Sequence, residues 1–311
     1  MIKIVGLEKK FEKHKVLNGL QLEVGDGELF GFIGPNGAGK TTTMKILAGL
    51  LKPDAGEITI NGVQLCEQPA IKRQLKQQIG YMPDFFGIYD NLTVKEYLEF
   101  FADIYHVPAR EQRIRISELL EFVGLEHRGN DLVDTLSRGM KQKLCLARIL
   151  VHDPSILLLD EPSSGMEPRA RIEMKQMLWG LAENGKTILI SSHILSELSE
   201  LCTSIGIIDQ GRMLLSGSKE EVMRQAAKNR PIMLRVVDGE EKAMELLKRH
   251  RAVRNISKDR DMISVSIEGD KQTEAEVLSY LVRYGILISS YQKSEGSLES
   301  LFVRLMQRRD E

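Results

Sequence analysis

The hydrophobic pattern of the chain begins as alternation and continues as a series of short apolar runs. Residues 1–6 alternate apolar and polar side chains, which predicts a strand. The apolar runs that follow have strand length, and such runs are typical of strands buried in a parallel sheet. We place the buried strands at residues 29–33, 154–159 and 186–190. Helices are expected at residues 41–51 and 94–105, and a further helix opens at the segment 136–142 and ends at residue 150. The pattern therefore predicts an α/β fold.

A second set of elements is expected after residue 230. A helix ending near residue 227 closes the first region, and residues 228–231 (Lys-Asn-Arg-Pro) have the composition of a linker. The segments beyond it predict the order βαββαβ with a last helix from Ser297, which fits a small ferredoxin-like α+β domain. We therefore expect a first domain at residues 1–227 and a C-terminal accessory domain at residues 231–311. The expected elements of the second domain are strands at 232–237, 253–257, 262–267 and 286–291 and helices at 240–250 and 272–284.

The expected C-terminal domain carries no visible catalytic constellation. Its basic run at residues 248–251 (Lys-Arg-His-Arg) is of a kind that usually forms a solvated face. Regulatory, dimerising and purely stabilising roles all stay open for this domain.

Composition and charge favour an ordinary globular protein. The 311 residues are 42% hydrophobic and 28% charged, and the net charge of −1 gives no argument for binding to nucleic acid. No run approaches the ~18 consecutive apolar residues that a membrane-spanning helix needs, and residues 1–6 lack the apolar region of a signal peptide. Cys66, Cys145 and Cys202 have no metal-like spacing, so we expect reduced thiols. These features predict a cytoplasmic protein whose membrane role, if any, comes through a partner.

The strongest chemical signal is the run Gly-Pro-Asn-Gly-Ala-Gly-Lys-Thr at residues 34–41. Two glycines, a lysine and a hydroxyl at these offsets form a phosphate-binding loop, whose backbone N–H groups point at phosphate oxygens. Lys40 supplies a charge for the β- and γ-phosphates, and Thr41 offers a hydroxyl to Mg²⁺. The helix after the loop adds to the anion site through its N-terminus. The residues expected to bind the nucleotide here are Gly34, Asn36, Gly37, Gly39, Lys40, Thr41 and Thr42.

Polar residues follow two further strands of the predicted sheet. Asp160 and Glu161 end one apolar strand, and His193 follows the strand at 186–190. Since ligands lie beyond the carboxyl ends of parallel strands, we expect these side chains beside the phosphate loop. Asp160 suits Mg²⁺, Glu161 suits orienting or deprotonating the attacking water, and His193 suits contact with the γ-phosphate or that water. The alternatives are solvated acids at a strand end and a structural histidine.

The segment Leu-Ser-Arg-Gly-Met-Lys-Gln at residues 136–142 resembles the signature of ATP-binding cassette (ABC) proteins, which is usually Leu-Ser-Gly-Gly-Gln. The order of phosphate loop, signature, acidic strand and strand-end histidine is similar to that family over roughly residues 1–225. The resemblance implies a P-loop NTPase cassette with a helical subdomain at about residues 85–150. It also implies a head-to-tail dimer, with an identical or a different second cassette, that encloses two ATP molecules.

In such a dimer the resemblance gives roles to residues outside the phosphate loop. Each γ-phosphate would meet Lys40 of one chain and Ser137 and Gly139 of the other. Phe11 stands where the family has an aromatic residue that stacks on adenine; the alternative is a core phenylalanine at the end of the first strand.

Three positions depart from the family pattern. Asp84 follows Gly-Tyr-Met-Pro, where the family usually has Gln, and its carboxylate is a possible Mg²⁺ ligand; the alternative is a solvated loop acid. Arg138 replaces a signature glycine and either assists the phosphate or points to solvent. Glu167 replaces an aspartate in the loop after the acidic strand. These departures leave nucleotide binding intact and bear on turnover and coupling.

Aromatic residues concentrate between Tyr81 and Tyr105, where eight of them lie within 25 residues. Aromatic side chains are enriched at interface hot spots and also fill helical cores. The resemblance places here a groove that receives a short helix from a membrane-embedded subunit. We expect part of this cluster to be core and part to line the groove.

We therefore predict the ATP-hydrolysing subunit of an ABC membrane transporter, with ATP and Mg²⁺ as cofactors. The membrane-spanning permease is expected on a separate chain that holds this one at the inner face of the cell membrane. The signature and the C-terminal extension resemble cassettes of ABC-2, export-type permeases, and no nucleic-acid partner is expected. The alternatives are a soluble cassette ATPase acting on ribosomes or DNA and a weakly hydrolysing regulatory module.

Overall fold

The computed structural model describes residues 1–65, 68–84, 87, 89, 91–228, 232–259, 261–293, 298 and 301–302. The described chain divides into two compact units, Met1–Lys219 and Glu220–Glu311. The helix expected to close the first domain, α8 (Lys219–Lys228), lies almost wholly in the second unit. Cys66, Phe85, Phe86, the linker residues 229–231 and most of the helix expected from Ser297 fall outside the described residues.

The large sheet of the first unit is almost entirely parallel. Its described strands are β3 (Leu29–Ile33), β6 (Ile79–Met82), β7 (Ile156–Asp160), β8 (Thr187–Ser192), β9 (Ser204–Asp209) and β10 (Arg212–Ser218). They are ordered β10-β9-β3-β8-β7-β6, and β10 runs antiparallel to β9. Strands β3, β7, β8 and β9 are buried along their whole length, as their apolar sequences predict. The predicted α/β class is confirmed.

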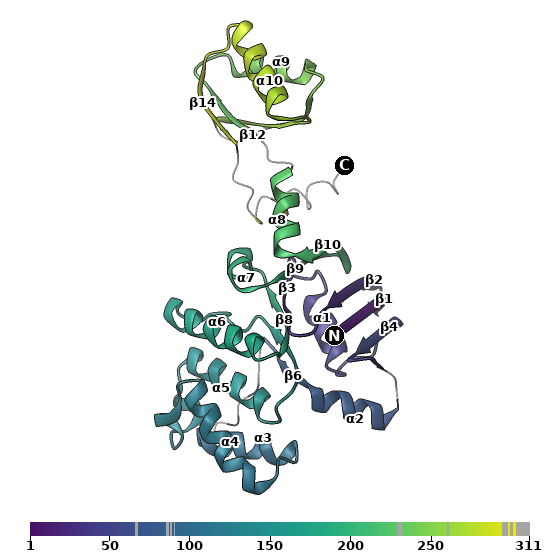
Figure 1. Ribbon diagram of the computed structural model, residues 1–311, viewed down its shortest axis with the longest axis vertical. Coiled ribbons are helices and arrows are strands. Elements are labelled where there is room, and N and C mark those ends of the chain that lie inside the picture. The colour runs from purple at the N-terminus through teal and green to yellow at the C-terminus, as the bar shows by residue number, and fades with distance from the viewer. Residues whose placement is uncertain are drawn as a thin grey trace. The chain divides into compact units, whose positions relative to one another are not determined.

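A smaller antiparallel sheet covers one side of this core. It contains β1 (Ile2–Phe11), β2 (His14–Val24), β4 (Ala55–Ile60) and β5 (Val63–Gln64), in the order β2-β1-β4-β5. Ile2 and Ile4 of β1 belong to the same buried cluster as Phe30 and Phe32 of β3 and Met44 of α1 (Lys40–Leu47). The helix α1 therefore lies between the two sheets, and all three elements share one hydrophobic core (Figure 1).

The residues between β6 and β7 form a helical subdomain with a core of its own. It contains α3 (Val94–Ile104), α4 (Ala109–Phe122) and α5 (Arg138–Leu150), whose buried side chains include Tyr97, Leu98, Ile116 and Leu144. The other helices of the first unit are α2 (Pro69–Gln78), α6 (Pro168–Glu183) and α7 (Leu195–Leu201), and short 3-10 turns lie at Glu126–Arg128 and Val133–Thr135. None of the helices in the described ranges is long and apolar enough to cross a membrane.

The second unit has the element order that its sequence predicts. Its elements are β11 (Ile232–Val236), α9 (Glu240–Arg249), β12 (Val253–Asp259), β13 (Met262–Ile267), α10 (Lys271–Arg283) and β14 (Ile288–Lys293). The described strands are antiparallel and ordered β12-β13-β11-β14. Strand β14 begins two residues later than expected, at Ile288, where its pairing with Val236 of β11 starts. Assignment to the ferredoxin-like class stays a prediction.

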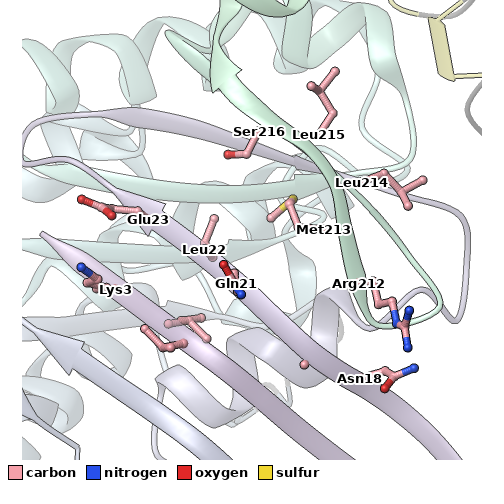
Figure 2. A pocket seen from close by; sticks show the side chains of 13 residues that line it. Lys3, Asn18, Gln21, Leu22, Glu23, Arg212, Met213, Leu214, Leu215 and Ser216 are labelled. Carbon is pink, nitrogen blue, oxygen red and sulfur yellow. The ribbon is translucent and has the colours of Figure 1, made fainter.

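An open groove of about 680 Å³ lies between β1, β2 and β10 (Figure 2). The two sheet edges meet at one end of it, where the Asn18 N–H donates to the Gly211 carbonyl over 3.0 Å. Gln21 and Glu23 project from β2, and Arg212 from β10. None of the predicted site residues lines this groove, so its size does not identify it as the site of chemistry.

Candidate active site

The phosphate loop leads from the end of β3 into α1 and is tightly packed at both ends. A methyl group built on Gly34 would lie 2.3 Å from the backbone oxygen of Ile208, and one on Gly39 would lie 2.6 Å from Cδ2 of Leu17. Gly39 also has a φ of 110°, which L side chains rarely adopt. Glycine at both positions is therefore required by the packing of the loop between β9 and β2.

Lys40 is buried beneath this loop, with 6% of its surface exposed. Its ammonium donates to the carbonyls of Gly34 at 2.6 Å and Pro35 at 3.2 Å. Burial lowers the pKa of the Lys40 ammonium, and the charges of Glu161 and then Asp160 oppose that shift. The structure thus brings the predicted lysine and the two predicted carboxylates into one electrostatic neighbourhood.

Asp160 ends β7 directly beside Ser191 of β8, with which it is in register. The Ser191 hydroxyl donates to Oδ1 of Asp160 over 2.6 Å, and both side chains are buried. Oδ2 of Asp160 is buried without a hydrogen-bond partner among the described residues. An unsatisfied carboxylate oxygen next to a phosphate loop fits Mg²⁺, which binds through one or two protein oxygens together with waters and phosphate. Thr41, another of the expected ligands, is exposed at the start of α1.

Glu161 and His193 form a direct pair at the edge of the sheet. Oε2 of Glu161 lies 2.9 Å from Nδ1 of His193. The Glu161 N–H donates to both the carbonyl and the hydroxyl of Ser191, at 3.2 and 3.1 Å. Burial raises the pKa of the Glu161 carboxyl, while His193 and then Lys40 oppose the rise. A carboxylate that is partly buried and oriented by a histidine is suited to binding a water molecule and taking its proton.

Ser191 is a site residue whose role the sequence motifs do not predict. It is fully buried and contacts both Asp160 and the backbone of Glu161. Its only sequence signal is a serine at the end of an apolar strand, and its function follows from the register of two strands far apart in the chain.

The signature residues lie at the start of α5, in the helical subdomain, whereas the phosphate loop joins β3 to α1 beside the antiparallel sheet (Figure 1). Ser137 is the N-cap of α5, and its Oγ accepts the Met140 N–H over 3.4 Å. Ser137 is exposed and Gly139 is half-buried. No hydrogen bond or ion pair in the described part of the chain joins them to the phosphate loop at residues 34–41. A single chain therefore does not bring all the predicted ATP contacts together.

Phe11 and Asp84 are placed at the margin of the site. Phe11 ends β1 with 44% of its surface exposed, and it pairs with His14 at the tip of the hairpin whose strand β2 packs against Gly39. Asp84 is exposed directly after β6. Burial raises the pKa of Tyr81, and the charges of Asp160 and Asp84 add to the rise, so both acids lie within reach of that phenol.

Comparison with known proteins decides the family. Residues 17–164 match the model of the family described as ABC transporter. The linearmycin resistance ATP-binding protein LnrL of Bacillus subtilis is 32% identical over 313 aligned residues, which cover 98% of this chain and 98% of that protein. The chain belongs to the ABC transporter family. It is the ATP-binding and ATP-hydrolysing subunit of an ABC transporter of export type.

Other ABC proteins support the same conclusion. The bacitracin transport ATP-binding protein BcrA of Bacillus licheniformis is 36% identical over 307 residues, covering 98% of this chain and 97% of that protein. The Nod factor export ATP-binding protein I of Burkholderia orbicola is 42% identical over 212 residues, which cover 68% of this chain and 69% of that protein. These relatives give no support to the alternative of a ribosome- or DNA-acting ATPase.

Solved ABC structures share the fold of the cassette. The ATP-binding subunit of an ABC transporter is 31% identical, with a TM-score of 0.66, and covers 73% of this chain and 93% of its own. A dimeric cassette in a post-hydrolysis state, bound to ADP and Pi, is 25% identical, with a TM-score of 0.64, and covers 70% of this chain and 99% of its own. The predicted P-loop cassette is confirmed.

The variant Glu161→Gln tests the assignment of the base. It keeps the shape of the side chain and removes its ability to take a proton, so ATP hydrolysis should fall by about 10²–10⁴-fold, while the affinity for ATP stays near that of the wild type. Hydrolysis is measured by phosphate release and affinity by titration with a fluorescent ATP analogue. The control is Glu183→Gln, the same change at an exposed position near the end of α6. Near-normal turnover of Glu161→Gln would remove this residue from the mechanism.

Proposed function

We propose that this cassette forms half of a two-chain ATP site, in which a second cassette supplies the signature. The proposal is supported by the exposed N-terminus of α5, which offers backbone N–H groups and the Ser137 hydroxyl to an anion. The phosphate loop lies elsewhere on the surface, so a second chain is needed to bring the two together. Dimeric cassettes among the solved relatives support the same arrangement. A homodimer and a heterodimer satisfy this geometry equally.

Within that site, the residues of this chain have separate roles in ATP hydrolysis. The grouping of a buried lysine, two strand-end carboxylates and a histidine at one edge of the sheet carries this proposal. Glu161 orients the attacking water and takes its proton, and His193 holds the Glu161 carboxylate in place. Lys40 faces the β- and γ-phosphates. Bound Mg²⁺ supplies positive charge to the phosphate oxygens, and Asp160 and Thr41 are the residues that would hold it.

The partner in the membrane is proposed to dock in a second groove, of about 880 Å³, lined by residues of α2, α3 and α5 and by Tyr81. Apolar and aromatic side chains line it beside three basic ones, Arg73, Lys76 and Arg148. Phe101 and Tyr105 are partly buried and line the groove, whereas Tyr97 is a core residue with 1% of its surface exposed. This surface fits a short amphipathic helix that carries an acidic residue, presented by the permease. Such docking would hold the chain at the inner face of the membrane.

The cargo is proposed to be an antimicrobial compound. Two relatives that align over nearly their full length are named for linearmycin resistance and bacitracin transport. Co-expression of this chain with its permease in a susceptible bacterium should raise the concentration of one of these compounds needed to stop growth. The same chain carrying Glu161→Gln is the control, since it should give no protection. Unchanged susceptibility to both compounds, with ATPase activity intact, would direct the search to other cargo.

The two-chain site predicts a specific result for Ser137→Ala. Removing the hydroxyl should weaken the ATP-dependent dimer of the Glu161→Gln chain by about tenfold or more, because a charge-assisted hydrogen bond to phosphate is lost. The affinity of the single chain for ATP should not change. Size-exclusion chromatography with and without ATP measures the dimer. A matched control is Ser117→Ala, at an exposed position on α4. Equal loss of dimer in both variants would contradict the assignment.

Asp84 is expected to serve coupling more than basal chemistry. It lies shortly after β6, and its charge acts on Tyr81, which lines the docking groove and is also affected by the charge of Asp160. We expect Asp84→Ala to lower the ATPase rate of the transporter complex more than that of the isolated cassette. The family-like variant Asp84→Gln should preserve more of the stimulation, because its amide oxygen can still bind a cation. Rates are measured with and without the permease. An equal fractional loss in both would show that Asp84 acts in chemistry alone.

A further inference from the structure

The loop that follows Glu161 is a series of turns leading to α6. The Ser164 N–H donates to the Glu161 carbonyl over 3.0 Å, and the Met166 N–H donates to the Ser163 carbonyl over 3.2 Å. Gly165 lies in the middle of it with a φ of 67°. We call residues 163–167 the linking loop. Because its turns start at the carbonyl of Glu161, a shift of the loop displaces the backbone of the proposed base.

The signature helix α5 holds the linking loop from one side. The amide of Gln142 donates to the Ser164 carbonyl over 2.9 Å, and only 3% of Gln142 is exposed. One turn earlier, a methyl group built on Gly139 would lie 3.3 Å from Cβ of Ala170 and 3.7 Å from Cε of Met166. The first two turns of α5 therefore pack closely on the loop and on the start of α6.

Arg138 completes this contact in a way that the sequence does not indicate. A methyl group built on Gly165 would lie 2.4 Å from Cζ of Arg138, 2.6 Å from Nη1 and 2.7 Å from Nε. Three guanidinium atoms at nearly equal distances mean that the plane of the group faces Gly165. The guanidinium thus fills the space that a side chain at residue 165 would take. Arg138 is an exposed residue whose guanidinium packs over Gly165.

The position of the Arg138 cation is not explained by favourable electrostatics among the residues that the structure describes. A cation in the first turn of a helix is disfavoured by the helix dipole. No hydrogen bond or ion pair to Arg138 is found within the described ranges of the chain, so a carboxylate does not explain its position there. The structure shows instead that the face of the guanidinium packs over Gly165, a contact that the planar group of arginine can make and the ammonium of lysine cannot.

We propose that Arg138 is a positioning residue that fixes the linking loop to the signature helix by covering Gly165. With Gln142, it makes the start of α5 and the backbone after Glu161 one rigid assembly. On the two-chain site proposed above, on which this inference rests, Ser137 and Gly139 then serve one ATP while Glu161 serves the other. Arg138 touches neither nucleotide and acts through Gly165.

Arg138→Ala and Arg138→Lys test the proposal in the full-length chain. Both should lower kcat by about tenfold or more, since mispositioning of catalytic groups by about 1 Å can cost about 10²-fold. The KM for ATP and the melting temperature should stay near the wild-type values. The control is Arg169→Ala, because that side chain on the neighbouring helix α6 is 92% exposed. Full activity of Arg138→Lys would overturn the proposal and indicate instead that the positive charge contacts phosphate. Wild-type kcat in Arg138→Ala would also overturn it.

A second measurement separates this inference from the proposed function. Hydrogen exchange of the peptide containing residues 161–168 should be faster in Arg138→Ala than in the wild type, in the nucleotide-free chain and without any dimer. Unchanged exchange in Arg138→Ala would refute the role of Arg138. Faster exchange combined with no ATP-dependent dimer in Glu161→Gln would refute only the two-chain site.

Discussion

The hydrogen bond from Ser191 to Asp160 joins two buried strands at the point where the chemistry is assembled. Both strands are buried along their whole length, and a slip in their register would separate Asp160 from Ser191 at the end of the sheet. Register in turn sets which residues leave the sheet together. Asp160 ends one strand beside Ser191, Glu161 binds the backbone of Ser191, and His193 follows two residues later to meet Glu161. The site thus depends on strand pairing before it depends on any loop.

Lys40 and Glu161, which lie near the Ser191–Asp160 hydrogen bond, carry opposite charges in a partly buried environment. Burial pushes the pKa of Lys40 down and that of Glu161 up, so each group alone would tend to become neutral. Each charge also opposes the shift of the other. Each charge favours the ionised form of the other group, and charges at a partly buried site act more strongly on a phosphate that carries several negative charges than on a neutral ligand.

Much of the fold can be read from local sequence, and the remainder depends on tertiary contacts. The sequence predicts the strand at residues 29–33 with the observed bounds, because its apolar run ends at a glycine-rich loop. Helix α1 ends at Leu47 rather than at residue 51, since Gly49 adopts a φ of 67° and stops the helix. Gly49 is visible in the sequence and could have been used to predict the end of this helix. By contrast, no local pattern places the Arg138 guanidinium on Gly165, because that contact joins segments separated by the length of a helix and a strand.

The same distinction applies to the site. The phosphate loop and the strand-end acids can be located from motifs, because glycines, a lysine and paired carboxylates have few other reasons to occur at those spacings. Such motifs do not predict the hydrogen bonds of Ser191 or the hydrogen bond from Gln142 to the linking loop. Each of these hydrogen bonds joins a side chain to a backbone group of another element. Its partner is therefore set by how the elements pack, which the sequence does not show.

Glu161 has a φ of 52°, a backbone conformation that residues other than glycine rarely adopt. Such a conformation costs about 1–3 kcal/mol, and the surrounding structure must hold it in place. At this position the protein is therefore less stable than its fold allows. A lineage that no longer needed ATP hydrolysis would gain stability by exchanging this glutamate for glycine. Glycine would relieve the strain but remove the carboxylate that pairs with His193, so backbone stability and catalysis make opposing demands on residue 161.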